Sequence, residues 1–101
     1  MLKASVAAGP SGPVMVLSGE ADLTSVGELS ALISAQLDGT QQLTIDMSGL
    51  RYADSASIRT LVLAARTLNK RGGSLVLLHP QPPVARILTL LGADQMLTVL
   101  G

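Results

Sequence analysis

Apolar segments of strand length alternate along this chain with longer segments whose apolar residues recur at helical spacing, and this alternation constrains the fold most. Residues 2–7 alternate between apolar and polar types, and residues 14–18 form a second strand-like segment. The turn-forming residues 9–13, Gly-Pro-Ser-Gly-Pro, lie between them. Because the link is short, we predict that the two strands pair antiparallel as a hairpin.

Three segments have the apolar periodicity of amphipathic helices. They cover residues 24–37, 55–70 and 82–91, and each is followed closely by a glycine, which is typical of a helix end. The residues predicted to face the core are Val26, Leu29, Leu32, Ile33 and Leu37 in the first segment, Ile58, Leu61, Val62, Ala65 and Leu68 in the second, and Val84, Ile87, Leu88 and Leu91 in the third.

Three further apolar segments, residues 43–47, 75–78 and 96–100, complete the order β-β-α-β-α-β-α-β. Ser48-Gly49 closes the first of them, and the strand over residues 75–78 is the most apolar, so we expect it at the centre of the sheet. Strands that alternate with helices imply right-handed crossovers and parallel pairing. We therefore predict one α/β domain over residues 1–101, with helices packed on a mixed, largely parallel sheet.

The composition excludes several classes of function. The sequence has no cysteine and one histidine, which excludes disulfides and argues against a zinc site. Its formal charge is zero and its only aromatic residue is a tyrosine, so we expect no binding to nucleic acid or directly to membranes. No apolar run is long enough to span a bilayer, and the N-terminus is too short and polar for a signal peptide. We expect a cytoplasmic protein, monomeric or weakly dimeric, with no catalytic activity, cofactor or metal.

Polar residues collect where the predicted parallel strands end, which is the edge at which such sheets form sites. Asp22 follows the second strand, Asp46 lies late in the third, Asp54 precedes the second helix and His79 ends the next strand. Asp22 and Asp46 could contact a partner or form turn hydrogen bonds. Ser55 could serve only as a helix N-cap, or it could present its hydroxyl for phosphorylation, because a helix N-terminus favours a phosphate.

A serine hydrolase is a further alternative, because Ser55, His79 and an aspartate at one edge could form a triad. The chain lacks the Gly-x-Ser-x-Gly pattern, however, and a proline follows His79 in a predicted loop. This alternative is therefore the least favoured one.

The second helix has apolar residues outside its predicted core stripe. Leu63 and Ala64 have no evident role in the core, and Arg59 lies one helical turn before Leu63. Exposed apolar residues of this kind can mark a contact patch. We therefore predict that the exposed side of this helix is a docking surface.

Several motifs carry a resemblance to a known family. Residues 19–22, Gly-Glu-Ala-Asp, resemble that family's Gly-Glu-Leu-Asp, and residues 45–48, Ile-Asp-Met-Ser, resemble its Val-Asp-Leu-Ser. Residues 54–58, Asp-Ser-Ala-Ser-Ile, resemble its Asp-Ser-Ser-Gly-Leu. Residues 71–73, the helix start at 82–86 and residues 91–94 follow in the matching order. Together these motifs span nearly the whole chain, which resembles the STAS domain of the bacterial anti-sigma factor antagonists.

The resemblance implies a function and a modification site. In that family, an anti-sigma factor with serine kinase activity phosphorylates the serine that matches Ser55, and the unphosphorylated domain binds this factor and frees a sigma factor. Ser57 replaces the family's glycine, which we expect to weaken or redirect the contact, and it offers a second, less favoured hydroxyl. The residues expected to bind the partner are Asp22, Asp46, Asp54, Ser55, Ser57, Arg59 and Leu63. Short STAS domains also accompany lipid-exporting ABC transporters, and docking on such an ATPase is the alternative.

Overall fold

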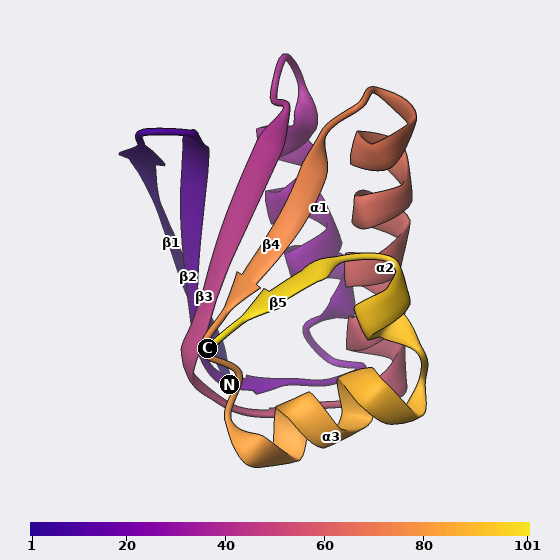
Figure 1. Cartoon of the computed structure of the whole chain (residues 1–101). Helices are drawn as coiled ribbons and strands as arrows, with labels where there is room; N and C mark the ends of the chain where they lie inside the picture. The colour runs from indigo at the N-terminus through magenta and orange to yellow at the C-terminus, as the bar shows by residue number, and fades with distance from the viewer.

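The computed structural model describes all 101 residues. They form a five-stranded sheet and three α-helices, which are connected by turns and loops (Figure 1). The predicted order β-β-α-β-α-β-α-β is confirmed, with one 3-10 turn before the last strand. The elements are β1 (Leu2–Gly9), β2 (Gly12–Ala21), α1 (Val26–Leu37), β3 (Gln42–Ala53), α2 (Ser55–Lys70), β4 (Ser74–Leu78), α3 (Pro82–Leu90), η1 (Ala93–Gln95) and β5 (Thr98–Leu100).

The sheet is mixed, as predicted. Its strands lie in the order β1-β2-β3-β4-β5, with β1 antiparallel to β2 and every other pair parallel. The middle strand is β3 rather than β4, so the expectation for residues 75–78 was wrong, although β4 does have a neighbour on each side. The alternation of Leu43, Ile45 and Met47 on β3 directs all three side chains into the core, where they are fully buried.

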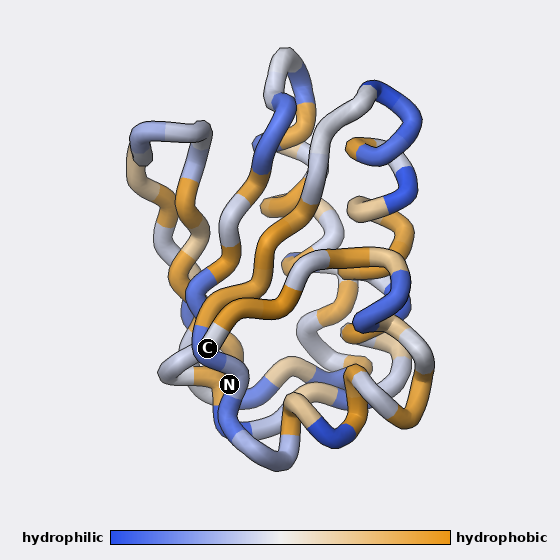
Figure 2. The backbone as a smooth tube through the Cα atoms, viewed as in Figure 1, coloured by the Kyte–Doolittle hydropathy of each residue, from blue (hydrophilic) through white to orange (hydrophobic).

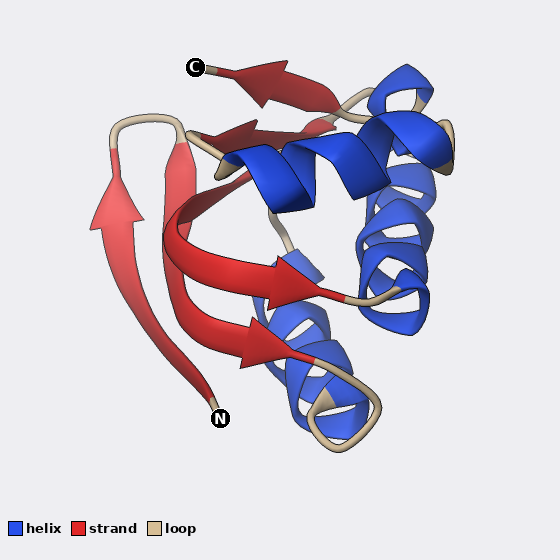
Figure 3. Cartoon of the chain, turned by 90° about the horizontal axis from the view of Figure 1, so that it is seen from below, coloured by secondary structure: helices blue, strands red, loops and turns tan.

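The three helices lie on one side of the sheet (Figure 3), and the aliphatic core lies between them and the sheet. Apolar residues are concentrated along β4 and on the helix turns that face the sheet, whereas the turn between α2 and β4 is hydrophilic (Figure 2). No aromatic side chain is buried in the core, and Met15 and Met47 are fully buried, where the flexible methionine chain can fill irregular space.

Two strands are longer than the sequence pattern predicts. The second strand was predicted to end at residue 18 and the third to be closed by Ser48-Gly49, but β2 continues to Ala21 and β3 to Ala53. The two strands stay paired through irregular register on both sides of Ser18, and Gly49 packs against Ser18 with almost no room for a side chain. Irregularities of this kind bend a strand pair. Figure 3 shows both strands curving toward the helices into which they lead.

The helices also differ from the predicted pattern at individual residues. The first helix begins at Val26 rather than at Thr24, because residues 22–25 form a turn. Ala64 is buried, so the prediction that it has no core role was wrong, and Val62 is only half-buried against the core. Leu91 was predicted to face inward but is 50% exposed, because α3 ends at Leu90.

The last strand is shorter than predicted, because residues 93–95 form a turn of 3-10 helix. Gly92 adopts the left-handed conformation, with a φ of 69°, and Met96 caps the 3-10 turn outside any strand. Ala93 and Leu97 occupy the core positions in this segment. No helix of the structure has the length and apolarity that a bilayer-spanning segment needs.

The loop between α1 and β3 and the loop between α2 and β4 contact each other at the end of the sheet distant from α3, and Gly73 lies at this contact. The Gln41 carbonyl accepts a hydrogen bond of 2.9 Å from the Ser74 N–H, and a Cβ at Gly73 would overlap that carbonyl oxygen. Gly73→Ala should therefore lower the free energy of unfolding by about 1–3 kcal/mol, since one loop must move away. Gly27→Ala is the matched control, because nothing lies within 4 Å of the added methyl group. It should stabilise α1 by about 0.5–1 kcal/mol. Urea denaturation measures both changes, and equal effects would contradict the assignment.

Candidate functional site

The ends of β2 and β3 bring two of the predicted site segments together. Ala21 pairs with Ala53 across the two strands, and the Asp54 N–H donates a hydrogen bond of 3.0 Å to the Ala21 carbonyl. Asp22 and Asp54 therefore follow directly after paired residues. The loop before α1 and the start of α2 lie side by side at one edge of the sheet.

Asp54, and not Ser55, is the N-cap of α2. Its backbone is extended, and its Oδ1 accepts a hydrogen bond of 2.9 Å from the N–H of Ser57. Asp54 thereby satisfies one of the free N–H groups of the first turn. Ser55 occupies the first helical position and is exposed. The interpretation of Ser55 as only a cap is therefore wrong, and its hydroxyl is free for other chemistry.

Ser57 lies on the opposite side of the helix from solvent. Its side chain is 1% exposed, and its buried Oγ has no hydrogen-bond partner. A kinase could not reach this hydroxyl without opening the helix. Because the side chain faces inward, it also cannot obstruct the approach of a partner to the helix surface, contrary to our expectation for the position where the family has glycine.

Asp22 organises the loop before α1. Its Oδ1 accepts hydrogen bonds from the hydroxyl and the N–H of Thr24, and these bonds lower the pKa of the carboxyl below its ordinary value. Ser25 is buried beside it and donates a hydrogen bond of 3.1 Å from its hydroxyl to the Asp22 carbonyl. The turn role that we considered for Asp22 is therefore present.

Asp46 does not belong to this group of residues, although we predicted it at the same edge. On β3 it pairs with Val16 and Leu78, and β3 continues for seven residues beyond Asp46, as far as Ala53. Its Oδ1 accepts a hydrogen bond of 2.9 Å from the N–H of Ser48, and hydrogen bonds from this serine lower the pKa of Asp46. Asp46 thus shares the end of β4 with His79.

The arrangement does not form a hydrolase triad. His79 follows Leu78, which is the partner of Asp46 in the sheet, whereas Ser55 follows the far end of β3. The N–H of His79 donates to the carbonyl of Leu100, which fixes the residue in an uncommon left-handed conformation with a φ of 54°. A triad requires a hydrogen bond between the serine and the histidine, and none is present. No three His, Asp or Glu side chains lie where they could hold a metal ion.

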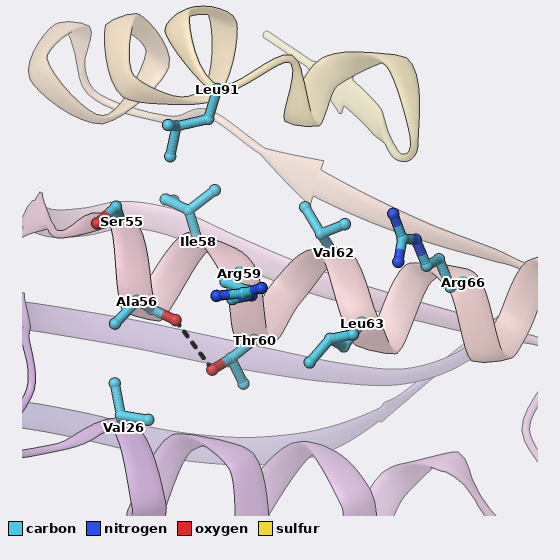
Figure 4. A pocket seen from close by; sticks show the side chains of 10 residues that line it. All are labelled: Val26, Ser55, Ala56, Ile58, Arg59, Thr60, Val62, Leu63, Arg66 and Leu91. Carbon is cyan, nitrogen blue, oxygen red and sulfur yellow. Dashed lines mark hydrogen bonds between the residues drawn. The ribbon is translucent and has the colours of Figure 1, made fainter.

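A groove of about 630 Å³ lies over the exposed side of α2. Figure 4 shows α2 as its floor, with Leu91 directed toward α2 from one side and Val26 from the other. Ser55 lies near one end of the floor and Arg66 near the other. The lining residues are Val26, Ser55, Ala56, Ile58, Arg59, Thr60, Val62, Leu63, Arg66 and Leu91.

Sequence reasoning identified only part of this groove. It singled out Ser55, Arg59 and Leu63, which line it. It missed Arg66, although the seven-residue spacing from Arg59 places both on one side of a helix. It also missed Leu91, because the apolar periodicity of the third helix assigned this leucine to the core.

This chain is similar in sequence to known proteins over most of its length. Residues 4–99 match the family model described as "Mlab, STAS domain". The chain is 30% identical over 80 residues to BtrV of Bordetella bronchiseptica, a protein assigned as an anti-sigma factor antagonist, and the match covers 78% of this chain and 69% of BtrV.

Solved structures share the fold. An anti-sigma factor antagonist from Mycobacterium paratuberculosis has a TM-score of 0.89 at 24% identity, over 99% of this chain and 86% of that one. SpoIIAA in its unphosphorylated form has a TM-score of 0.82 at 21% identity, over 96% of this chain and 87% of that one. The phosphorylated form of the Bacillus protein has a TM-score of 0.75 at 20% identity, over 96% and 90%.

The matched residues cover nearly the whole chain, and the BtrV match covers more than two thirds of both proteins. The chain therefore belongs to the STAS domain family.

Proposed function

We propose that this protein is an anti-sigma factor antagonist that binds an anti-sigma factor with serine kinase activity and is switched off when that factor phosphorylates Ser55. In this way it regulates transcription that depends on a sigma factor, and it acts in the cytoplasm. The observation that carries the proposal is the exposed Ser55 hydroxyl at the start of α2, beside a groove and outside the helix cap.

The same geometry argues that Ser55, and not Ser57, is the phosphate acceptor. A kinase must bring the hydroxyl into contact with the γ-phosphate of its nucleotide, which requires an exposed side chain. Ser55 is exposed, whereas the Oγ of Ser57 is buried. SpoIIAA, a protein of the same fold, has been solved in both an unphosphorylated and a phosphorylated form, which supports a phosphate acceptor on this fold.

Phosphorylation is expected to block the interface without refolding the domain. The phosphate adds close to two negative charges at pH 7. The helix N-terminus stabilises them by about 0.3–1 kcal/mol, while the adjacent carboxylate of Asp54 opposes them by a similar amount across solvent. These effects nearly cancel in the free domain. A partner that covers Ser55 would instead have to desolvate the dianion, which costs several kcal/mol if it is unpaired.

The docking surface in this proposal is the exposed side of α2 together with the loop before α1. Leu63 is 53% exposed on α2, and Arg59 is exposed one turn before it. Asp22 and Asp54 lie beside Ser55 at the end of the same surface. Asp46 is separated from it, so we assign Asp46 no contact with the partner.

An ABC transporter ATPase is the alternative partner for the same helix surface. An affinity pulldown that uses the purified domain as bait in a lysate of its native cells discriminates between the two candidate partners. Recovery of a serine kinase supports the proposal, and recovery of a transporter ATPase in its place supports the alternative.

Variants of the two serines test the acceptor. Ser55→Ala should fold normally, resist phosphorylation and bind the kinase constitutively, and Ser55→Asp should fold but bind poorly. Ser57→Ala should still accept one phosphate. It should also raise the free energy of unfolding by about 1 kcal/mol, because it removes a buried hydroxyl without a partner. Mass spectrometry locates the phosphate, and thermal denaturation measures stability. A phosphate found only on Ser57, or widespread backbone shifts by NMR after phosphorylation of Ser55, would count against the proposal.

A charge on the exposed face of α2 tests the docking surface. Leu63→Glu should abolish binding of the kinase while it changes the free energy of unfolding by no more than about 0.5 kcal/mol, because Leu63 points to solvent. Val6→Glu, on the exposed part of β1, is the matched control and should leave binding unchanged. Isothermal titration calorimetry measures the affinity. If Leu63→Glu binds as well as the control, the surface is elsewhere.

A further inference from the structure

The groove over α2 is positively charged as well as apolar. Arg59 and Arg66 line it, and none of its lining residues is acidic. Neither arginine forms an ion pair, since both salt bridges of the structure involve Glu20. This local charge stands out in a chain whose formal charge is zero.

The two arginines flank the apolar part of the groove. They are seven residues apart on α2, which is two turns or about 10.5 Å along the helix axis. Leu63 lies between them, and Leu91 adds a second half-exposed leucine from the end of α3 (Figure 4). A guanidinium pairs well with a carboxylate because it can donate two parallel hydrogen bonds.

We propose that this groove binds an acidic amphipathic helix of the protein partner, with two carboxylates spaced two turns apart that pair with Arg59 and Arg66. An apolar side chain of the same helix, between the carboxylates, would contact Leu63 and Leu91. This inference rests on the proposed function for the identity of the partner, and it adds the chemistry that the partner must present.

A second copy of this chain does not fit that description. Among the three helices, α1 carries one acidic residue, Glu28, and α2 and α3 carry none. No helix of the chain could therefore place carboxylates two turns apart against the two arginines. The charge pattern favours a different protein as the occupant.

An acidic partner also explains how a phosphate would weaken binding. Ser55 lies four residues, or about one turn, before Arg59 on the same helix. Arg59 gives this end of the groove one positive charge, and a phosphoserine adds close to two negative charges. Asp22 and Asp54 already place negative charge beside Ser55, so phosphorylation would make this end of the groove more negative by close to two charges and would oppose the attraction of Arg59 for a partner carboxylate.

Synthetic peptides test the chemistry without the natural partner. The probe is an alanine-rich helical peptide with two glutamates two turns apart and a leucine between them, and its matched control has lysines in place of the glutamates. Both are titrated into ¹⁵N-labelled protein. The acidic peptide should shift the amides of Val62, Leu63 and Arg66, and it should bind about tenfold more tightly than the basic one. In the double variant Arg59→Glu, Arg66→Glu the preference should reverse, so that the basic peptide binds more tightly. Phosphorylation of Ser55 should weaken the binding of the acidic peptide.

The outcomes separate this inference from the proposed function. Equal binding of both peptides, no shift from either at millimolar concentration, or shifts confined to the open face of the sheet would overturn the acidic-helix proposal. So would a preference for anionic phospholipid vesicles over both peptides. If Leu63→Glu abolishes kinase binding and the double arginine variant does not, the acidic-helix proposal is wrong and the proposed function stands. If the acidic peptide binds as described but no kinase is captured, the groove chemistry is supported and the proposed function is wrong.

Discussion

The parallel pairing of β2 with β3 is the constraint on which the rest of the structure depends. The two strands remain paired through irregular register as far as Ala21 and Ala53, and there they curve toward the helices. The bond from the Asp54 N–H to the Ala21 carbonyl then fixes the start of α2 against the loop before α1. Without this curvature, both helices would begin farther from each other and the groove over α2 would have only one wall.

Sequence periodicity predicted the order of elements but not the length of the strands. Glycine normally weakens a strand, and the predicted strands over residues 14–18 and 43–47 both stop before a glycine, Gly19 or Gly49. In the structure the pairing passes through both, because Gly19 adopts a positive φ of 89° and Gly49 permits close contact with Ser18. Such bends depend on both strands at once, and a pattern read along one strand does not reveal them. The misplacement of Asp46 follows directly from this error.

The environment of the two serines was, in contrast, encoded in the helical phase. Successive helix positions rotate by about 100°, so residues two positions apart face in nearly opposite directions. Ser57 is in phase with the core residues Leu61 and Ala64, and Ser55 is out of phase with them. The helical phase of Ser57 therefore predicts a buried position, but the residue was not assigned to the core because serine is polar. The groove was harder to predict, since Leu91 reaches it only because α3 ends one residue before it.

The short last strand has a consequence for how the native structure opens. Only three residues of β5 pair with β4, and all three are exposed, so its separation from the sheet sacrifices little buried surface. Segments of this kind exchange their amide hydrogens through local opening rather than through global unfolding. When β5 opens, the most apolar strand of the sheet acquires an unpaired edge, which is the kind of edge that recruits other chains. Association of the domain through β4 would therefore require only the local opening of β5, at a free energy well below that of complete unfolding.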